Sequence, residues 1–417
     1  MIEKLALNGG QPVRSKPLPP YYPGAVSYGE EEKLEVLEVL ERKSPFRYYG
    51  PDVAGKVRKF ETYLADKTGS KHVLAVTSGT ASLVVALKAL EIGPGDQVIV
   101  PANTFLATAG AVVIAGAIPV FADVDDSLNI DPNDIARLVN DRTKAVIPVH
   151  ILGNPCEMDK VMSISRQHHL AVIEDVAQSC GCTYQGKAAG TFGDMGCFSL
   201  QMNKIITTGD GGAVVTDDPS LYERAVRYHD QGMFREREGF LGMKEEDDIF
   251  IGQNYRMSEV TGAIALAQIR KLDAIITKMR QTKKWIKSQI QDIKAITFRR
   301  INDEAGDAGN ALFLLLPSAE KAAEFRAALN AENISTSWLY NGNPVYKLPQ
   351  IFNQRTVDRN GFPFNQIPGG IKYTSGMCPN AENLLSRNAL IYLGPLIETK
   401  DATDIVKGIR KVAQNIF

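Results

Sequence analysis

The sequence predicts an α/β protein in which a mostly parallel sheet is covered by helices on both faces, followed by a smaller α+β domain. Two observations support this fold. From about Lys71 to Val215, short apolar runs alternate with helical segments, and beyond about residue 290 this alternation stops. The chain has 417 residues, of which 44% are apolar, and this is enough for a large core and two domains.

The apolar runs of the first part are nearly continuous, as expected for strands buried on both faces of a sheet. The expected strands are HVLAV (72–76), DQVIVP (96–101), IPVFADV (118–124), KAVIPVHIL (144–152), LAVIED (170–175), CFSLQ (197–201) and GGAVVTD (211–217). The expected helices between them are 80–90, 104–116, 131–140 and 158–169. Repeated strand–helix–strand units of this kind predict a three-layer α/β/α domain.

The second part of the chain has a different texture. A helical segment from about Ser258 to Ile290 is expected to contain a break, because small and apolar residues fill its first half and lysines its second. The elements expected after it are strands at 296–301 and 311–317, a helix at 318–333, a long loop at 338–379 and a final helix at 399–417. We therefore expect an N-terminal arm (1–29), a large domain (30–285) and a small domain (286–417).

Charge and composition exclude several classes of function. The net charge is −1, and acidic and basic residues are interleaved, so no basic surface for nucleic acid or an anionic membrane is expected. The N-terminal segment lacks the apolar core of a signal peptide, and no run approaches the ~18 apolar residues of a membrane span. We expect a cytoplasmic protein.

The five cysteines do not predict disulfides or a metal site. Their number is odd, and their spacing suits no disulfide framework. Cys180 and Cys182 are separated by one residue, whereas zinc-binding pairs usually have two to four intervening residues and a second pair of ligands. Buried thiols in a reducing compartment are the expected state, with no metal.

Three groups of polar residues fall at the ends of expected strands, where parallel sheets bind ligands. Thr77 to Thr80 follow the first strand and open a helix, which suits either a phosphate site or a simple helix cap. Asp175 ends another strand, and an acid there is often only a cap. Lys204 lies between two expected strands with few charges near it, and Ser199 precedes it by five residues.

Taken together, these groups match the needs of pyridoxal 5′-phosphate (PLP). That cofactor requires a lysine amine for a Schiff base, an acid at its pyridine nitrogen and a cup for its phosphate. Asp175 and Lys204 are 29 residues apart, about one strand and hairpin, so both can reach the same end of the sheet.

The sequence resembles the DegT/DnrJ/StrS sugar aminotransferase family, which has the type I fold of PLP-dependent aminotransferases. The resemblance runs from about residue 30 to the C-terminus in the family's order. The matching segments are TSGTASL (77–83), GDQVIVPANTFLATA (95–109), AGAIPVFADVD (115–125), VIEDVAQSCG (172–181), GDMGCFSLQMNK (193–204), TTGDGGAVVTDD (207–218), GQNYRMSEVTGAIALAQI (252–269) and CPNAENLLSR (378–387).

The resemblance implies a role for each matching residue. Lys204 would form the Schiff base with PLP and carry protons, and Asp175 would pair with the pyridine nitrogen. Gln178 would bond near the phenolic oxygen of PLP, and Phe105 would stack on its ring, although core packing also explains an aromatic residue there. The phosphate would be held by Gly79, Thr80 and Ser199. Asn254 would reach the phosphate of the neighbouring subunit, which implies a homodimer with shared active sites, although it also suits the turn before a helix.

Two departures from the family pattern concern the substrate. Many members have His where this chain has Gln201, and many have Pro-Leu-His where it has Pro344-Val345-Tyr346. Gln201 and Tyr346 are therefore candidate substrate contacts. The segment Phe46 to Gly50 is similar to members that act on cyclitols, octulosonates and aminobenzoate precursors. Three arginines remain open as the clamp for the donor carboxylate: Arg227, Arg256 and Arg387.

The function expected from the resemblance is transfer of an amino group from glutamate or glutamine to a keto- or aldehydo-sugar, with the cofactor cycling between PLP and pyridoxamine phosphate (PMP). Two alternatives are a PMP-dependent sugar dehydratase and a non-catalytic PLP-binding regulatory protein. The dehydratase relatives carry His in place of Lys204, and the regulatory protein would not need both Lys204 and Asp175. The lysine and the acid therefore favour the aminotransferase.

Overall fold

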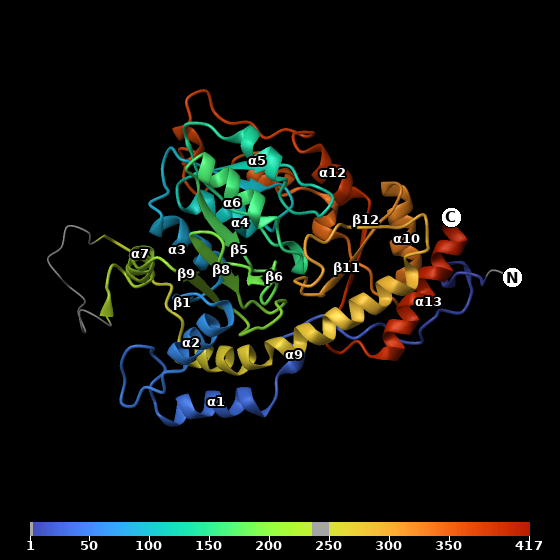
Figure 1. The fold of residues 1–417 in the computed structure, drawn as a ribbon, viewed down its shortest axis with the longest axis horizontal. Helices are drawn as coiled ribbons and strands as arrows, with labels where there is room; N and C mark the ends of the chain where they lie inside the picture. The colour runs from blue at the N-terminus through green and yellow to red at the C-terminus, as the bar shows by residue number, and fades with distance from the viewer. Residues whose placement is uncertain (1–2, 236–249) are drawn as a thin grey trace.

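The computed structural model describes residues 3–235 and 250–417, and within them a seven-stranded sheet, here called the large sheet, forms the centre of the molecule (Figure 1). Its strand order is β1-β9-β8-β5-β4-β2-β3, and β9 is antiparallel to both of its neighbours while the other described pairs are parallel. The strands are β1 (His72–Val76), β2 (Gln97–Pro101), β3 (Ile118–Ala122), β4 (Thr143–Val146), β5 (Ala171–Asp175), β8 (Met195–Ser199) and β9 (Gly212–Thr216). The predicted α/β fold with a mostly parallel sheet is confirmed.

Helices cover both faces of the large sheet. Successive side chains of a strand point to opposite faces, so a strand whose residues are all apolar needs a helical layer on each face. Val98 and Val100 of β2 pack in the cluster that contains α3 (Gly79–Ala89) and α4 (Leu106–Ile114), together with α7 (Pro219–His229). Ile99, between them, packs on the other face with α5 (Pro132–Leu138) and α6 (Met158–Gln167). Next to these, α2 (Lys56–Thr68) and α9 (Glu259–Ile290) cover the same face near β1, β8 and β9.

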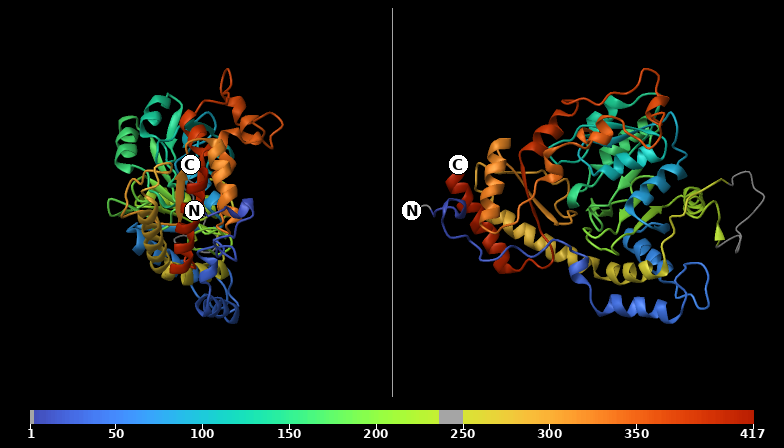
Figure 2. Two further views of the ribbon diagram at one scale, coloured as in Figure 1. Left: turned by 90° about the vertical axis from the view of Figure 1, so that its right-hand side faces the viewer. Right: turned by 180° about the vertical axis from the view of Figure 1, so that it is seen from behind.

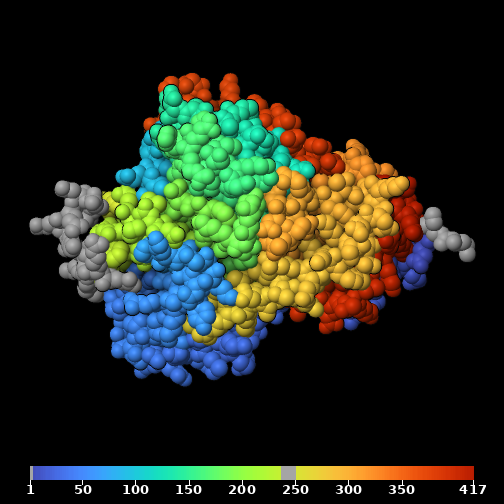
Figure 3. Space-filling model, in the orientation of Figure 1, coloured from blue at the N-terminus to red at the C-terminus, as the bar shows by residue number. Residues whose placement is uncertain are grey.

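The helix α9 is continuous, and the predicted break within it is wrong. It spans 32 residues from its N-cap Ser258, whose hydroxyl accepts a hydrogen bond from the amide of Thr261. No proline lies in this segment, and Lys, Gln, Arg and Ile residues in its second half sustain a helix. The helix therefore runs from beneath the large sheet to the C-terminal part of the molecule (Figures 1 and 2). In the space-filling view α9 lies beside the blue surface of α1 (Glu30–Glu41) and α2 (Figure 3).

A second sheet of the described residues, here called the small sheet, has the order β10-β11-β12 and is antiparallel. It consists of β10 (Thr297–Phe298), β11 (Ala311–Leu315) and β12 (Asn388–Tyr392), and it packs with α10 (Ala319–Ala331) and α13 (Thr399–Ile416) around a separate core. The predicted α+β character of this part is confirmed, although β12 was not recognised in the sequence. Both ends of the chain lie on this side of the molecule (Figure 1).

The segment expected to be a long loop, 338–379, contains short helical turns. They are η4 (Leu339–Gly342), η5 (Val345–Lys347), α11 (Pro349–Phe352) and η6 (Phe364–Gln366), and α12 (Pro379–Ser386) follows. The remaining short elements are η1 (Ala6–Asn8), η2 (Ala25–Ser27), η3 (Ile151–Gly153), β6 (Thr183–Tyr184) and β7 (Lys187–Ala188).

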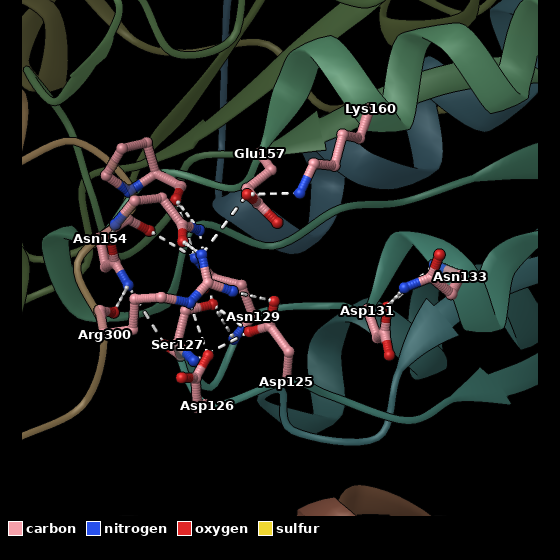
Figure 4. Close-up of polar contacts among 12 residues, drawn as sticks. Asp125, Asp126, Ser127, Asn129, Asp131, Asn133, Asn154, Glu157, Lys160 and Arg300 are labelled. Carbon is pink, nitrogen blue, oxygen red and sulfur yellow. Dashed lines mark hydrogen bonds and ion pairs between the residues drawn. The ribbon is translucent and has the colours of Figure 1, made fainter.

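Arg300 joins the small sheet to the loops that follow β3 and β4 (Figure 4). Its guanidinium contacts Asp125, bonds to Asp126 at 2.6 Å and approaches Glu157 at 3.4 Å. Asn154 completes the junction by donating to the carbonyl of Arg300 at 3.0 Å. These contacts connect the small sheet to the loops after β3 and β4 of the large sheet.

Among the described residues, the helices are too short or too polar to cross a lipid bilayer.

Candidate active site

The carboxyl ends of β5 and β8 and the start of α3 meet at a cavity of about 800 Å³. Asp175 is the last residue of β5, Ser199 is the last residue of β8, and Gly79 is the first residue of α3, three residues after the end of β1. All three line the cavity. This is the location expected for a ligand of a parallel sheet.

The start of α3 forms a small cup in this cavity. Ser78 caps the helix, its hydroxyl accepting from the amide of Ala81 at 3.0 Å. A β-carbon placed on Gly79 would lie 2.6 Å from the β-carbon of Ser199, so only glycine fits there. Thr80 and Ser199 also line the cavity. Free amide groups at a helix N-terminus together with hydroxyls suit a phosphate group.

Lys204 lies in the turn between β8 and β9 and lines the same cavity. Its amide donates to the carbonyl of Gln201 at 2.9 Å, and its carbonyl accepts from the amide of Gly24 at 3.4 Å. Burial lowers the pKa of the Lys204 amine, and the negative charge of Asp175 opposes that shift. The amine is thus easier to deprotonate than an exposed lysine.

Asp175 is 4% exposed and is held by two donors. The hydroxyl of Thr108 donates to Oδ2 at 2.9 Å, and the amide of Ala177 donates to Oδ1 at 3.0 Å. Burial raises the pKa of Asp175, while these two hydrogen bonds and the charge of Lys204 counteract the rise. The arrangement fixes the carboxylate in direction and leaves each oxygen able to accept a further hydrogen bond from the cavity.

Three further predicted residues line the cavity: Phe105, Gln178 and Gln201. Phe105 precedes α4 and is 60% exposed, so its ring is not a core residue. The amide nitrogen Nε2 of Gln178 donates to the hydroxyl of Tyr340 at 2.9 Å. The Oε1 atom of Gln201 accepts from the amide of Asn203 at 2.9 Å.

Two predicted residues lie elsewhere. Asn254 is exposed, pairs with Asp230 in an isolated β-bridge and does not line the cavity of its own subunit. Tyr346 is fully buried beside Phe121, and its hydroxyl donates to Glu382 at 2.6 Å. The predicted substrate contact of Tyr346 is therefore not supported, because its polar end is already satisfied inside the core.

The three arginines considered for the donor carboxylate also lie outside the lining of the cavity, as far as the described residues define it. Arg227 bonds to Glu223 at 2.9 Å, and Arg256 contacts Asp230. Arg387 donates to the carbonyl of Leu316 at 2.9 Å. Each thus has a partner within its own subunit.

Part of the cavity wall was missed in the sequence. It comes from the N-terminal arm, with Tyr21, and from the small-sheet side, with Asn310, Tyr340 and Tyr392. Tyr21 stacks on Tyr392 with ring centroids 4.5 Å apart, and the Nδ2 atom of Asn310 bonds to the hydroxyl of Tyr21 at 3.2 Å. The only local signal was the tyrosine content of the arm and loops, which does not say where those segments pack.

The described residues contain no group of three His, Cys, Asp or Glu side chains placed to hold a metal. All five cysteines are buried and free, and burial raises the pKa of each thiol.

Comparisons with known proteins agree with one another. A sequence model of the DegT/DnrJ/EryC1/StrS aminotransferase family matches residues 27–410. GDP-perosamine synthase of Escherichia coli O157:H7 is 33% identical over 80% of this chain and 87% of its own length. L-glutamine:2-deoxy-scyllo-inosose aminotransferase of Streptomyces kanamyceticus is 33% identical over 70% of this chain and 68% of its own.

Solved structures of other proteins have a similar fold over nearly the whole chain. A 3-amino-5-hydroxybenzoic acid synthase superposes with a TM-score of 0.82, at 25% identity, over 96% of this chain and 100% of that chain. A GDP-4-keto-6-deoxymannose-3-dehydratase with a trapped PLP-glutamate geminal diamine superposes with a TM-score of 0.79, also at 25% identity, over 94% and 99%.

Proposed function

Because the chain belongs to the DegT/DnrJ/EryC1/StrS aminotransferase family, we propose that its cavity transfers an amino group from glutamate or glutamine to a keto- or aldehydo-sugar of the nucleotide-sugar, cyclitol or octulosonate type. The chain is a PLP-dependent sugar aminotransferase with the type I aminotransferase fold. The observation that carries the proposed site is the Lys204 amine and the Asp175 carboxylate on one cavity.

The residues of the cavity fit PLP. Gly79, which has no side chain, lets the start of α3 approach Ser199 closely, so the helix amides and the hydroxyls of Thr80 and Ser199 face one cavity, which suits a phosphate group. The proposed phosphate ligands are Gly79, Thr80 and Ser199. Gln178 is proposed to bond to the phenolic oxygen, and Phe105 to cover the ring. Gln201 lines the cavity near Lys204 and is proposed to contact the substrate.

The proposed chemistry divides between the cofactor and the chain. PLP supplies a ring that withdraws electrons and so stabilises negative charge at the α-carbon of the amino donor. The Lys204 amine would hold PLP covalently and, once released, would take the proton from that α-carbon. Its lowered pKa makes the unprotonated amine more abundant near neutral pH. The Asp175 carboxylate is held by Thr108 and Ala177 and would keep a proton on the ring nitrogen.

Two other functions were considered. A sugar dehydratase is among the structural neighbours, but Lys204 occupies the position at which the dehydratase relatives carry histidine. A non-catalytic PLP-binding protein would need the phosphate cup but neither the base nor the buried acid. Turnover with an amino donor and an oxo-sugar separates both from the aminotransferase.

The assembly is a further part of the proposal. We propose a homodimer in which the exposed Asn254 of one subunit reaches the phosphate held by the other. In that case Asn254→Ala and Lys204→Ala damage different halves of a composite site. A mixed dimer of the two variants then contains one intact site and recovers up to about half of the wild-type activity. Mixed dimers no more active than the mean of the parents would place Asn254 within its own subunit.

The division of the chain into an arm (1–29), a PLP-binding domain (30–285) and a small domain (286–417) is also proposed, as is a cytoplasmic location. The boundary at 285 falls inside α9, which packs against both parts. Limited proteolysis with and without PLP tests the division.

The decisive experiment labels the lysine that binds the cofactor. Borohydride reduction of the PLP-loaded protein followed by peptide mapping is expected to place the label on Lys204. Lys204→Ala is expected to keep PLP bound without a covalent bond and to lose turnover. Lys283, a buried lysine outside the cavity lining, serves as the matched control, and a label on it or on any other lysine would contradict the assignment. A screen of oxo-sugars against the PMP-loaded protein then identifies the acceptor.

A further inference from the structure

Tyr340 has an unusual backbone conformation at the edge of the candidate site. Its φ is 48° and that of Asn341 is 52°, both in the left-handed region. For a bulky residue this conformation costs about 1–2 kcal/mol, so it persists only where the surroundings enforce it. Residues held in this way cluster at sites of function.

The turn that contains Tyr340 is held from both sides. The indole nitrogen of Trp338 donates to the carbonyl of Leu385 at 2.8 Å, and the amide of Leu339 donates to Oδ1 of Asn388 at 3.2 Å. The ring of Trp338 packs against Gly342 so closely that a β-carbon there would lie 2.0 Å from it. The contacts of α12 and β12 with this turn thus maintain the strained conformation.

The result of the strain is one contact across the cavity. The side chain of Tyr340 lines the cavity, and its hydroxyl accepts a hydrogen bond from Nε2 of Gln178 at 2.9 Å. Burial raises the pKa of Tyr340, so the hydroxyl stays neutral. Asn310, the residue before β11, donates from Nδ2 to the backbone carbonyl of Gln178 at 3.4 Å. Residues of the small-sheet side therefore hold Gln178, which follows β5, at both its side chain and its backbone.

We propose that Tyr340 is a positioning residue of the proposed aminotransfer reaction, whose hydroxyl orients the Gln178 amide toward the phenolic oxygen of PLP. The inference rests on the proposed function. A side-chain amide is planar, and its two N–H bonds lie about 120° apart, so fixing one of them restricts the directions open to the other. Tyr340 engages one N–H of Nε2 and thereby restricts where the second can point.

The orientation has a measurable consequence. A donor on the phenolic oxygen competes with the proton of the Lys204–PLP Schiff base for the same oxygen. The Schiff base therefore loses its proton at a lower pH when the amide is in place, and its pKa rises when the amide turns away. This pKa is read from the visible absorbance of bound PLP, without turnover.

The experiment titrates the absorbance of the PLP-loaded full chain against pH. Tyr340→Phe removes the hydroxyl and keeps the ring, and its titration midpoint is expected to rise by about one pH unit, a tenfold change in proton affinity. Turnover is expected to fall about tenfold with little change in the KM of the amino donor. Tyr373→Phe is the matched control, because the Tyr373 hydroxyl is also buried and bonded, to the carbonyl of Pro119, but lies outside the cavity lining. Its midpoint is expected to match the wild type.

A double-variant cycle tests whether Tyr340 acts through Gln178. Gln178→Ala is expected to raise the midpoint at least as far as Tyr340→Phe, and combining the two is expected to add nothing. An unchanged midpoint in Tyr340→Phe, or effects that add in the double variant, would overturn the positioning role while leaving the aminotransferase intact. A wild-type protein without a visible PLP band would instead overturn the proposed function, and this inference with it.

Discussion

Lys204 and Lys283 are both shielded from water, but they lie in regions of different structure. Lys204 lies at the carboxyl edge of the large sheet and lines an open cavity of about 800 Å³. Lys283 lies on α9 beside the small sheet, next to a void of about 10 Å³, and its ammonium bonds directly to Asp307 at 2.5 Å. Burial lowers the pKa of both lysines.

The two lysines differ in the groups that surround them. Around Lys283, the guanidinium of Arg299 donates to the carbonyls of Ile151 and Leu152 at 2.8 and 2.6 Å and lies 4.3 Å over the ring of Phe313. This closed cluster ties the small sheet to the loop after β4. A lowered pKa alone therefore does not identify a functional lysine; the cavity that gives a ligand access to Lys204 does.

The largest effect on stability is expected from breaking the buried ion pair between Lys283 and Asp307. Asp307→Asn leaves the charge of Lys283 buried without a counter-ion and should lower the free energy of unfolding by about 3–5 kcal/mol. Turnover per folded site should not change, since Asp307 does not line the cavity. Urea unfolding of the variant measures the loss.

The matched control removes both charges. The double variant Asp307→Asn with Lys283→Met should recover most of the stability, because a buried ion pair replaced by uncharged groups is often neutral. If Asp307→Asn instead reduced turnover at unchanged stability, the division into a structural and a functional lysine would be wrong.

The next prediction compares two adjacent carboxylates of β5. Asp175→Asn should lower turnover about 10²–10³-fold, because a neutral amide cannot keep a proton on the pyridine nitrogen. Its stability should not fall, because the raised pKa of Asp175 shows that burial disfavours the charge that the substitution removes. Steady-state kinetics and urea unfolding of the same preparations test both statements.

Glu174 provides the control for Asp175. Its carboxylate is fully buried and accepts hydrogen bonds from His150 and from the amides of Gly190, Phe192 and Gly193. Glu174→Gln turns an amide group toward those donors and should cost about 1–3 kcal/mol of stability at nearly unchanged turnover per folded site. If both substitutions had the same effects on turnover and on stability, the assignment of a catalytic role to Asp175 and a structural role to Glu174 would be wrong.

The strands of the large sheet and the residues at its carboxyl edge could be predicted because short, local sequence patterns mark them. Apolar runs marked the strands, and the catalytic candidates fell at a strand end (Asp175) and just after an expected strand (Lys204), where topology brings them together. The cup at Gly79 was recognisable as a strand-to-helix turn. These features depend on short stretches of chain and on one rule about parallel sheets.

The small-sheet wall could not be derived in the same way. Tyr340 enters the cavity through a left-handed backbone that no local sequence pattern predicts for tyrosine. Tyr21 and Tyr392 meet through segments about 370 residues apart, so their stacking depends on long-range packing. Lys283 lay in a stretch rich in lysines, and its burial against Asp307 became visible only once α9 was seen to be continuous.

The smallest predicted effect is a change in stability of opposite sign when each of the two lysines is replaced by methionine. The folded-state pKa of Lys204 is lowered below the value of about 10.4 in the unfolded chain. Between these two values the unfolded state binds more protons, so stability rises with pH there, and the full penalty of Lys204 is felt below its folded-state pKa. Lys204→Met removes that penalty and should stabilise the cofactor-free protein by about 1 kcal/mol at pH 7.

The gain should shrink as the pH approaches 10.4, since a neutral lysine carries no penalty. Lys283→Met, the same substitution in the closed cluster, should instead destabilise at pH 7, because Asp307 is left buried and unpaired. Urea unfolding of both variants and the wild type at pH 7 and pH 10, without PLP, measures the two differences. Stabilisation by both substitutions, or a Lys204→Met gain that does not depend on pH, would mean that Lys204 is not held at a cost to folding. The lowered pKa that the proposed chemistry needs would then have to arise only when the cofactor binds.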